Sequence, residues 1–199
     1  DGERTPMSKG DFLITPSWTF HDHGNPGNEP VIWLDVLDVP MVQFFDAGFL
    51  ERHPQASQPV ARPMDDSLAR YGAGLLPVDY NADPAISPVF RYPYERTRQT
   101  LQQAASNGPI DPAYGVRLRF AHPGTGGWPT PTMGAFCQWL PAGFSGQTYR
   151  STDATIYCPI EGSGRSWIGE QLVEWQPHDV FVVPSWVPVR HETRLDAVL

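Results

Sequence analysis

The sequence predicts an all-β protein built from two copies of one structural unit, and three observations support this prediction. The 22 prolines and 18 glycines interrupt helices, so they favour a loop-rich β protein over a helical bundle. Short apolar segments separated by turn residues follow one another closely in the last third of the chain. Finally, residues 10–23 align without a gap with residues 178–191, which is the signature of an internal repeat.

The repeat aligns identical residues and differs at one position that matters for chemistry. Asp11 aligns with Asp179, residues 16–18 with residues 184–186 (Pro-Ser-Trp in both copies), and His23 with His191. The exception is His21, which aligns with Val189. If the unit holds a metal, the first copy has kept the site and the second has lost it.

The first half of the chain contains two expected strands, a long connector and one helix. We expect strands within residues 10–20 and over residues 31–37, the second extended by residues 41–45, with a loop at 23–28 between them. Residues 51–92 carry prolines every few positions and predict an irregular connector. Pro93 suits a first helical turn and Asn107-Gly108 suits an end, so residues 94–106 are predicted to form the one short helix.

The second half is expected to consist of short strands that form a small antiparallel barrel or sandwich. The expected strands cover residues 116–120, 133–140, 154–160, 165–168, 171–175 and 179–183. By the repeat alignment Asp1 corresponds to Gly169, whereas the second copy begins near Phe136. The first copy is therefore expected to lack roughly the first 30 residues of its unit, as in an N-terminally truncated chain.

Composition limits the partners and the compartment. A net charge of −8 argues against nucleic acid or an anionic membrane as the main partner. The longest apolar run, residues 180–189, contains two prolines and is too short to span a bilayer. Cys137 and Cys158 lie in apolar segments, so we expect buried free thiols in a reducing cytosol and a cytoplasmic protein, rather than a disulfide.

One motif in the first copy resembles a motif of a known superfamily. Gly10, Pro16 and His21 follow the spacing of the second cupin motif, G-x5-P-x-G-x2-H, with Trp18 in place of the inner glycine. The wider sequence resembles the gentisate 1,2-dioxygenase family, with its salicylate and 1-hydroxy-2-naphthoate dioxygenase relatives. This resemblance rests on residues 21–25 and 33–40, and on 65–67, 70–72, 75–77, 87–88, 92–94, 125–127 and 182–186.

The resemblance implies a bicupin, two jelly-roll barrels joined by a connector, assembled as a homotetramer. Residues 1–50 would be the C-terminal, iron-site part of the first cupin, here incomplete. Residues 51–125 would be the connector, and residues 126–199 a second, metal-free cupin. The implied activity is Fe(II)-dependent ring cleavage of gentisate or a related aromatic hydroxy acid by O2, which gives maleylpyruvate from gentisate.

The resemblance also implies the roles of individual residues. His21 would be one of three histidine ligands of Fe(II), and the other two, an HxH pair, would lie upstream of Asp1. His23 would contact the substrate as a catalytic neighbour, and Asp35 would be an acid close to it. In the second copy, Tyr149 and Ser151 occupy the HxH places and Val189 that of the third ligand, so no metal is expected there.

Alternatives remain open at each site residue. His21 and His23 could together form an HxH ligand pair, although the spacing from Gly10 and Pro16 favours the later motif. His23 could be structural, since His191 persists in the second copy, and Asp35 could cap a turn. Three arginines could hold a substrate carboxylate or lie on a solvated helix face: Arg91, Arg96 and Arg98. Three further histidines without partner spacing are expected to be structural: His53, His122 and His178.

Two other functions compete with the dioxygenase interpretation. A non-enzymatic, metal-free cupin fragment or small-molecule-binding module would keep the fold without iron, and the missing HxH pair favours it. One imidazole cannot hold Fe(II) usefully, so this chain alone is expected to be inactive. A cupin isomerase or sugar epimerase is a weaker alternative, because those proteins lack the Trp33–Asp38 segment. The sequence does not select among gentisate, salicylate and 1-hydroxy-2-naphthoate.

Overall fold

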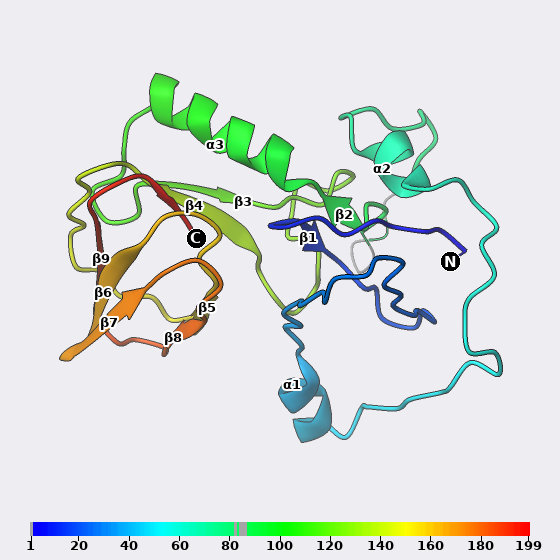
Figure 1. Cartoon of the computed structure of the whole chain (residues 1–199). Coiled ribbons are helices and arrows are strands. Elements are labelled where there is room, and N and C mark those ends of the chain that lie inside the picture. Colours follow the sequence, from blue (N-terminus) through cyan, green and yellow to red (C-terminus); the bar gives the residue numbers. More distant parts are fainter. Residues whose placement is uncertain (1, 82, 84–86) are drawn as a thin grey trace. The chain divides into compact units, whose positions relative to one another are not determined.

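The computed structural model describes residues 2–81, 83 and 87–199, and the chain divides into two compact units (Figure 1). The N-terminal unit comprises Asp1–Tyr92 and Ala121–Gly134. The C-terminal unit comprises Pro93–Phe120 and Ala135–Leu199. No helix in the described part of the chain is long and apolar enough to cross a membrane.

The C-terminal unit is a small antiparallel β structure whose strands wrap around a common core (Figure 1). Its three sheets have the strand orders β10-β4-β3, β7-β6-β9 and β5-β8. The strands are β3 (Val116–Arg119), β4 (Phe136–Leu140), β5 (Thr155–Tyr157), β6 (Gly164–Ile168), β7 (Gln171–Trp175), β8 (Phe181–Val183), β9 (Val189–Thr193) and β10 (Ala197–Val198). Each strand expected in this half forms, with shorter bounds in most cases, while β9 and β10 were not predicted.

Side chains along the strands alternate between buried and less buried positions, and the buried ones form the core. Residues 189, 191 and 193 of β9 are buried and residues 190 and 192 are less so, as the two-residue period of a half-buried strand requires. The core contains three stacked aromatic rings: Tyr157 and Trp175 both stack on Phe181, with ring-centroid separations of 5.1 and 6.3 Å. Burial of these large rings contributes much of the stability of the unit.

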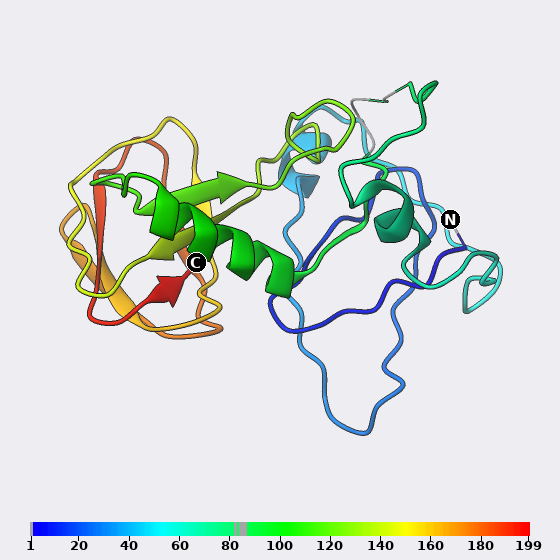
Figure 2. The same cartoon turned by 90° about the horizontal axis from the view of Figure 1, so that it is seen from above.

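Helix α3 (Tyr94–Asn107) covers the outer face of β3 and β4 (Figure 2). Leu101 is fully buried and packs with Val116, Cys137, Trp139 and Val198. Pro93 precedes the first turn, and the backbone N–H of Gly108 closes the last turn on the carbonyl of Ala104. The predicted helix over 94–106 is therefore confirmed.

The N-terminal unit has little regular structure. Its elements are β1 (Phe12–Leu13), which pairs with β2 (Arg91–Tyr92), and the short helices α1 (Val39–Phe44) and α2 (Asp66–Tyr71). The predicted strand over 31–37 and its extension over 41–45 are wrong. Residues 31–37 are exposed and have no partner strand in the described chain. Helix α1 begins at Val39, and the fixed φ of Pro40 suits its first turn. Helix α2 was also not predicted, because residues 51–92 were assigned to an irregular connector.

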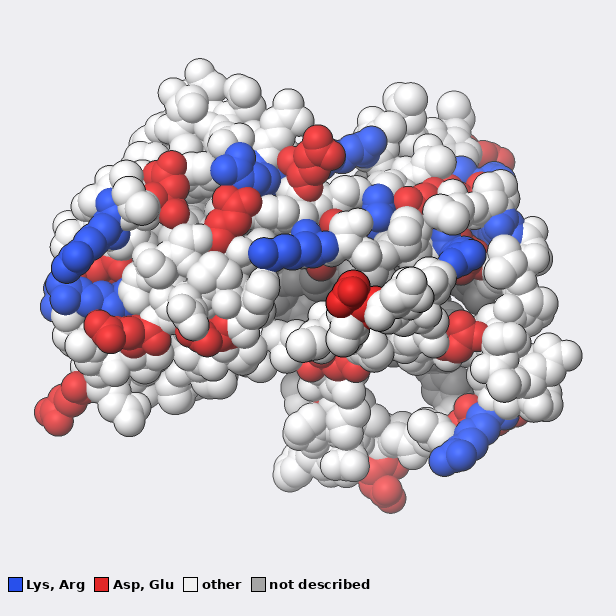
Figure 3. Space-filling model, viewed as in Figure 1, with Lys and Arg blue, Asp and Glu red and all other residues white. Residues whose placement is uncertain are grey.

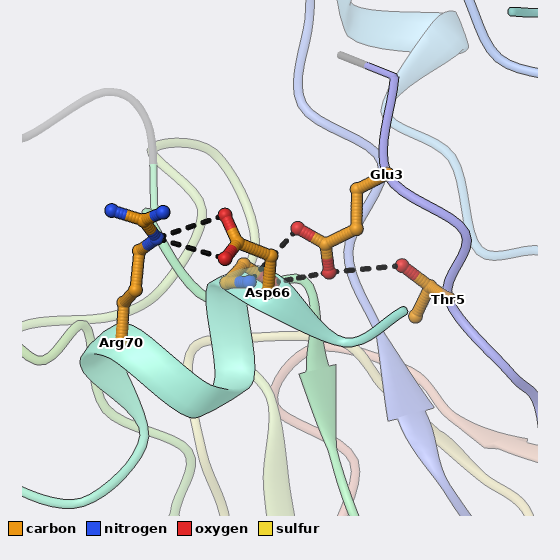
Figure 4. A network of polar contacts seen from close by, with 5 residues as sticks. Glu3, Thr5, Asp66 and Arg70 are labelled. Carbon is orange, nitrogen blue, oxygen red and sulfur yellow. Dashed lines mark hydrogen bonds and ion pairs between the residues drawn. The ribbon is translucent and has the colours of Figure 1, made fainter. Parts of the chain in front are cut away.

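A network of polar contacts attaches the N-terminal segment to α2 (Figure 4). The Glu3 carboxylate accepts hydrogen bonds from the backbone N–H and the hydroxyl of Ser67, at 2.9 and 2.8 Å. One turn away, Arg70 Nε donates to both carboxylate oxygens of Asp66 at 2.9 Å. Asp66 and Ser67 are buried, so these motif residues hold the local fold.

The two copies of the repeat adopt the same local geometry. Asp11 and Asp179 each accept a hydrogen bond on the side chain from the N–H three residues earlier, and each donates its own N–H to that residue's carbonyl. The preceding residues, Gly10 and His178, both have positive φ, at 81° and 76°. The repeat detected in the sequence is therefore a repeat of backbone conformation.

Candidate functional site

The structure brings the three predicted site residues together on the N-terminal unit. The imidazole rings of His21 and His23 lie edge to face, with centroids 5.6 Å apart. His23 stacks on the indole of Trp33 at 5.0 Å, and Trp33 Nε1 donates a hydrogen bond of 3.3 Å to Asp35 Oδ2. Trp33 was not singled out as a site residue, although it stands in the Trp-Leu-Asp segment that carries the family resemblance.

Trp33 lies between Asp35 and His23 and contacts both. The indole ring holds the flat face of His23 and its N–H holds the carboxylate, so one side chain connects the two predicted groups. Trp33 thereby limits the directions in which His23 and Asp35 can turn.

The cluster is open to solvent and lies outside regular strands. His21, His23 and Asp35 are all exposed, and the sole polar contact of His21 among the described residues is Nδ1 at 3.4 Å from the carbonyl of Thr19. The His21 ring therefore keeps Nε2 available for a ligand. Nearby rings also lie at the surface, with Trp18 packed on Phe49 at 4.8 Å between ring centroids.

The described residues do not by themselves make a metal site. Within residues 2–81, 83 and 87–199, no three His, Cys, Asp or Glu side chains gather closely enough to hold a metal ion. Fe(II) in proteins needs a set of imidazole and carboxylate ligands on one face of the ion. This chain can supply His21 toward such a set, or His21 with His23, but does not complete one.

In the C-terminal unit the equivalent location is filled by a buried hydrogen-bond network. Tyr149 Oη lies 3.1 Å from His191 Nε2 and 3.0 Å from Tyr157 Oη. On the other side of the ring, His191 Nδ1 lies 2.7 Å from Ser166 Oγ, which accepts a 2.9 Å hydrogen bond from Trp175 Nε1. This network joins four strands or loops around His191, which is completely buried.

The network keeps His191 neutral. Burial, helped by the positive charge of Arg117, lowers the pKa of His191 to about 4. A neutral ring carries one N–H, so in a consistent arrangement Ser166 donates to Nδ1 and Nε2–H donates to Tyr149. Burial also raises the pKa of the Tyr149 hydroxyl, which stays protonated and can donate to Tyr157.

Most of the other candidate residues have structural contacts. Arg91 pairs with Asp11 and Asp65 at 3.4 and 3.3 Å, and Arg98 Nε lies 2.8 Å from Glu161 Oε1, while Arg96 is exposed. Arg96 therefore lies on a solvated helix face. Arg91 forms ion pairs in a mostly buried position, and Arg98 forms an ion pair that is partly exposed.

The remaining histidines and the cysteines also behave as structural residues. His122 is fully buried and accepts the Gly124 N–H on Nδ1, and His53 accepts the Gln55 N–H. Both cysteines are free thiols; Cys137 is buried and Cys158 partly so. Burial raises the pKa of Cys137 to about 12, so that thiol is unreactive at neutral pH.

Comparison with known proteins points to one group of enzymes. The Cupin domain family matches residues 1–37. Along its whole length the chain is 49% identical to gentisate 1,2 dioxygenase 1 of Aquipseudomonas alcaligenes, of which it covers 57%. It is 34% identical over 96% of its length to a 5-aminosalicylate 1,2-dioxygenase of Comamonas sp., of which it covers 50%.

A solved structure gives the same result for the fold. A variant of the salicylate 1,2-dioxygenase of Pseudoaminobacter salicylatoxidans, in complex with gentisate, matches 96% of this chain with a TM-score of 0.88 and 30% identity. The match covers 55% of that chain. The cupin fold and the resemblance to the gentisate 1,2-dioxygenase family, both predicted from the sequence, are confirmed. The chain spans about half the length of the relatives that it matches.

Proposed function

We propose that this chain is part of an Fe(II)-dependent ring-cleaving dioxygenase that acts with O2 on gentisate or a related hydroxybenzoate, giving maleylpyruvate from gentisate. The observation that carries the proposal is the 49% identity to a gentisate 1,2-dioxygenase along the whole chain. The clustering of His21, His23 and Asp35 supports it, because the residues that the family resemblance selects lie side by side.

In this proposal His21 is one iron ligand, and further ligands come from outside the described residues. When bound, the iron would supply the open coordination positions at which a hydroxybenzoate and O2 meet. His23, which stacks on Trp33, would accept a hydrogen bond or a proton from a substrate hydroxyl. Asp35 keeps the Trp33 indole in place through its hydrogen bond to Nε1.

The proposal extends to the organisation of the protein. Residues 1–50 would belong to a first cupin, 51–125 to a connector and 126–199 to a second, metal-free cupin, in a cytoplasmic homotetramer. The conformational repeat supports two cupin copies, and the two free thiols fit a reducing compartment. On the face seen in Figure 3, positive and negative side chains are intermixed, which fits a small-molecule substrate better than nucleic acid. Light scattering would test the tetramer.

The experiment is a paired measurement of intact mass, iron content and gentisate cleavage, made on the protein purified from its native coding region and on the 199-residue chain. We expect about one iron per subunit and ring cleavage for the native product, and neither for the 199-residue chain. The His21→Ala variant of the native product should lose both. The control His53→Ala, a half-buried histidine of the N-terminal unit that contacts Gln55 and Phe20, should lose neither.

Two outcomes would contradict the proposal. Full activity in His21→Ala, or iron-free native protein without gentisate cleavage, would favour the alternative of a non-enzymatic, metal-free cupin that serves as a binding module.

A further inference from the structure

A carboxylate at the start of helix α1 contacts a distant loop instead of capping its own helix. Asp38 is the N-cap residue of α1, and an aspartate there normally accepts a hydrogen bond from a backbone N–H of the first turn. Here the N–H groups of Met41 and Val42 donate to the Asp38 carbonyl, and the carboxylate makes no cap. It accepts a 2.6 Å hydrogen bond from the hydroxyl of Thr132, in the loop of residues 121–134. A hydrogen bond to a charged group at this distance is a strong one.

The loop that carries Thr132 is braced by contacts of its own. His122 is completely buried, and its backbone N–H donates to the carbonyl of Gly127 at 2.9 Å. The indole of Trp128 lies against Gly134, where a Cβ atom would come within 3.1 Å of the ring. Thr132 is itself exposed, so the shape of the loop determines where its hydroxyl group stands.

The stretch that leads from the candidate site to Asp38 needs such a tether. Trp33 and Asp35 lie in this stretch, and Trp33 also stacks on His23. Residues 31–37 are exposed and form no strand. Among the residues that the structure describes, the hydrogen bond from the loop to Asp38 is the one that joins this stretch to a segment far away in the sequence. Without it, the chain around the indole would be less restrained.

We propose that Thr132 is a positioning residue for the candidate site, because its hydroxyl group holds Asp38 and thereby fixes where Trp33, Asp35 and His23 stand. Thr132 acts through the chain between Asp38 and Trp33 and is not itself a catalytic residue. The inference rests on the proposed function, since the groups that it positions are those assigned to the substrate. A small displacement of such groups slows a reaction strongly, because proton transfer needs the donor and acceptor within hydrogen-bond reach.

The test compares two substitutions of the same residue. Thr132→Val removes the hydroxyl group at nearly constant size, and Thr132→Ser keeps it. The matched control is Thr100→Val on α3, because Thr100 is also exposed and its hydroxyl donates to the Arg96 carbonyl at 2.8 Å. Asp38→Ala, alone and combined with Thr132→Val, completes a double-mutant cycle.

Two measurements are made on each variant. The first is kcat and KM for gentisate with the iron-loaded native product. The second is the rate at which the Trp33 indole N–H exchanges with solvent, measured by NMR on the ¹⁵N-labelled 199-residue chain, in which Trp33→Phe assigns the signal by its loss. The second measurement needs neither iron nor turnover, so it separates the positioning role from the proposed function.

We expect Thr132→Val to lower kcat about tenfold while KM changes less than about twofold, because the substrate still binds but its reaction partners are displaced. Exchange of the Trp33 N–H should become at least about threefold faster. Thr132→Ser should restore both values, and Thr100→Val should change neither. The combined variant should be no slower than Asp38→Ala, because both substitutions remove the same hydrogen bond.

Three results would overturn the proposal: an unchanged Trp33 exchange rate in Thr132→Val, a serine variant that behaves like the valine variant, or additive effects in the combined variant. Normal kcat in an active Thr132→Val enzyme would overturn it as well. If the native product neither holds iron nor cleaves gentisate, the proposed function fails, and the exchange rates alone then decide whether Thr132 positions the Trp33 segment.

Discussion

Tyr149 and Val189 exchange two backbone hydrogen bonds of 2.9 Å, so they face each other across an antiparallel bridge. Directly opposite residues on neighbouring strands carry their side chains on the same face of the sheet. Val189 is the repeat counterpart of His21, and Tyr149 stands where an HxH pair is expected. The C-terminal unit thus keeps the backbone arrangement that could bring metal ligands together and fills it with Val189 and a hydrogen-bonded tyrosine.

The first prediction concerns Tyr149. Its hydroxyl links His191 Nε2 to the Tyr157 hydroxyl, so Tyr149→Phe leaves two buried polar groups without this partner. We expect a loss of about 1–3 kcal/mol in the free energy of unfolding, measured by urea denaturation. The control is Tyr114→Phe, because the Tyr114 ring packs on Tyr149 while no hydrogen bond of its hydroxyl is found among the described residues. An equal loss of unfolding free energy in both variants would mean that the hydrogen bonds of Tyr149 do not stabilise the protein measurably.

The second prediction concerns pH and His191. Burial lowers the pKa of His191 from 6.5 to about 4, so between these values the unfolded chain binds more protons than the folded one. The stabilisation is complete above pH 6.5 and is lost as the pH falls toward 4, amounting to about 3 kcal/mol across this window. Denaturation curves between pH 4 and 7.5 should show this slope, and His191→Gln should flatten it. An unchanged slope in the variant would assign the effect to other groups.

The fold was most predictable where one local signal determined the structure. The helix after Pro93 depends on nearby residues, and the sequence located it. Residues 31–37 did not form a strand because a strand needs a partner, and pairing partners lie far away in the sequence. In the C-terminal copy β9 pairs with β6, whereas its counterpart around residues 21–25 has no paired strand in the described chain.

The sequence predicted which residues form the candidate site, but it did not predict how they contact one another. Resemblance selected His21, His23 and Asp35, and they cluster. The intervening Trp33 was missed, because stacking depends on backbone curvature that spacing along the chain does not reveal.

The third prediction concerns Asp35 in the iron-loaded native protein. Asp35→Asn keeps the shape of the side chain but removes the charge beside the Trp33 indole and the stacked His23. We expect kcat for gentisate to fall about 10- to 100-fold, with little change in iron content. The control is Asp46→Asn, an exposed position with a φ of 51° that Asn tolerates. If Asp35→Asn keeps normal kcat, Asp35 only caps the local chain.

The last prediction concerns the two tryptophans of the repeat. Trp18 and Trp186 have φ of 64° and 63°, left-handed values at the position where the cupin motif has glycine. A residue with a Cβ loses about 1–2 kcal/mol there, and glycine does not. Trp186 is 59% exposed, and its N–H donates to the Ser151 carbonyl at 2.8 Å, a hydrogen bond that any residue except proline can keep.

Truncation to glycine and to alanine separates conformation from lost packing, because both remove the indole. We expect Trp186→Gly to be more stable than Trp186→Ala by about 1 kcal/mol in thermal or urea unfolding. The matched control is Leu172 on β7, also half-exposed but outside the residues with positive φ, where the alanine variant should be the more stable of the pair. The same order at both positions would show that the left-handed conformation at Trp186 costs little.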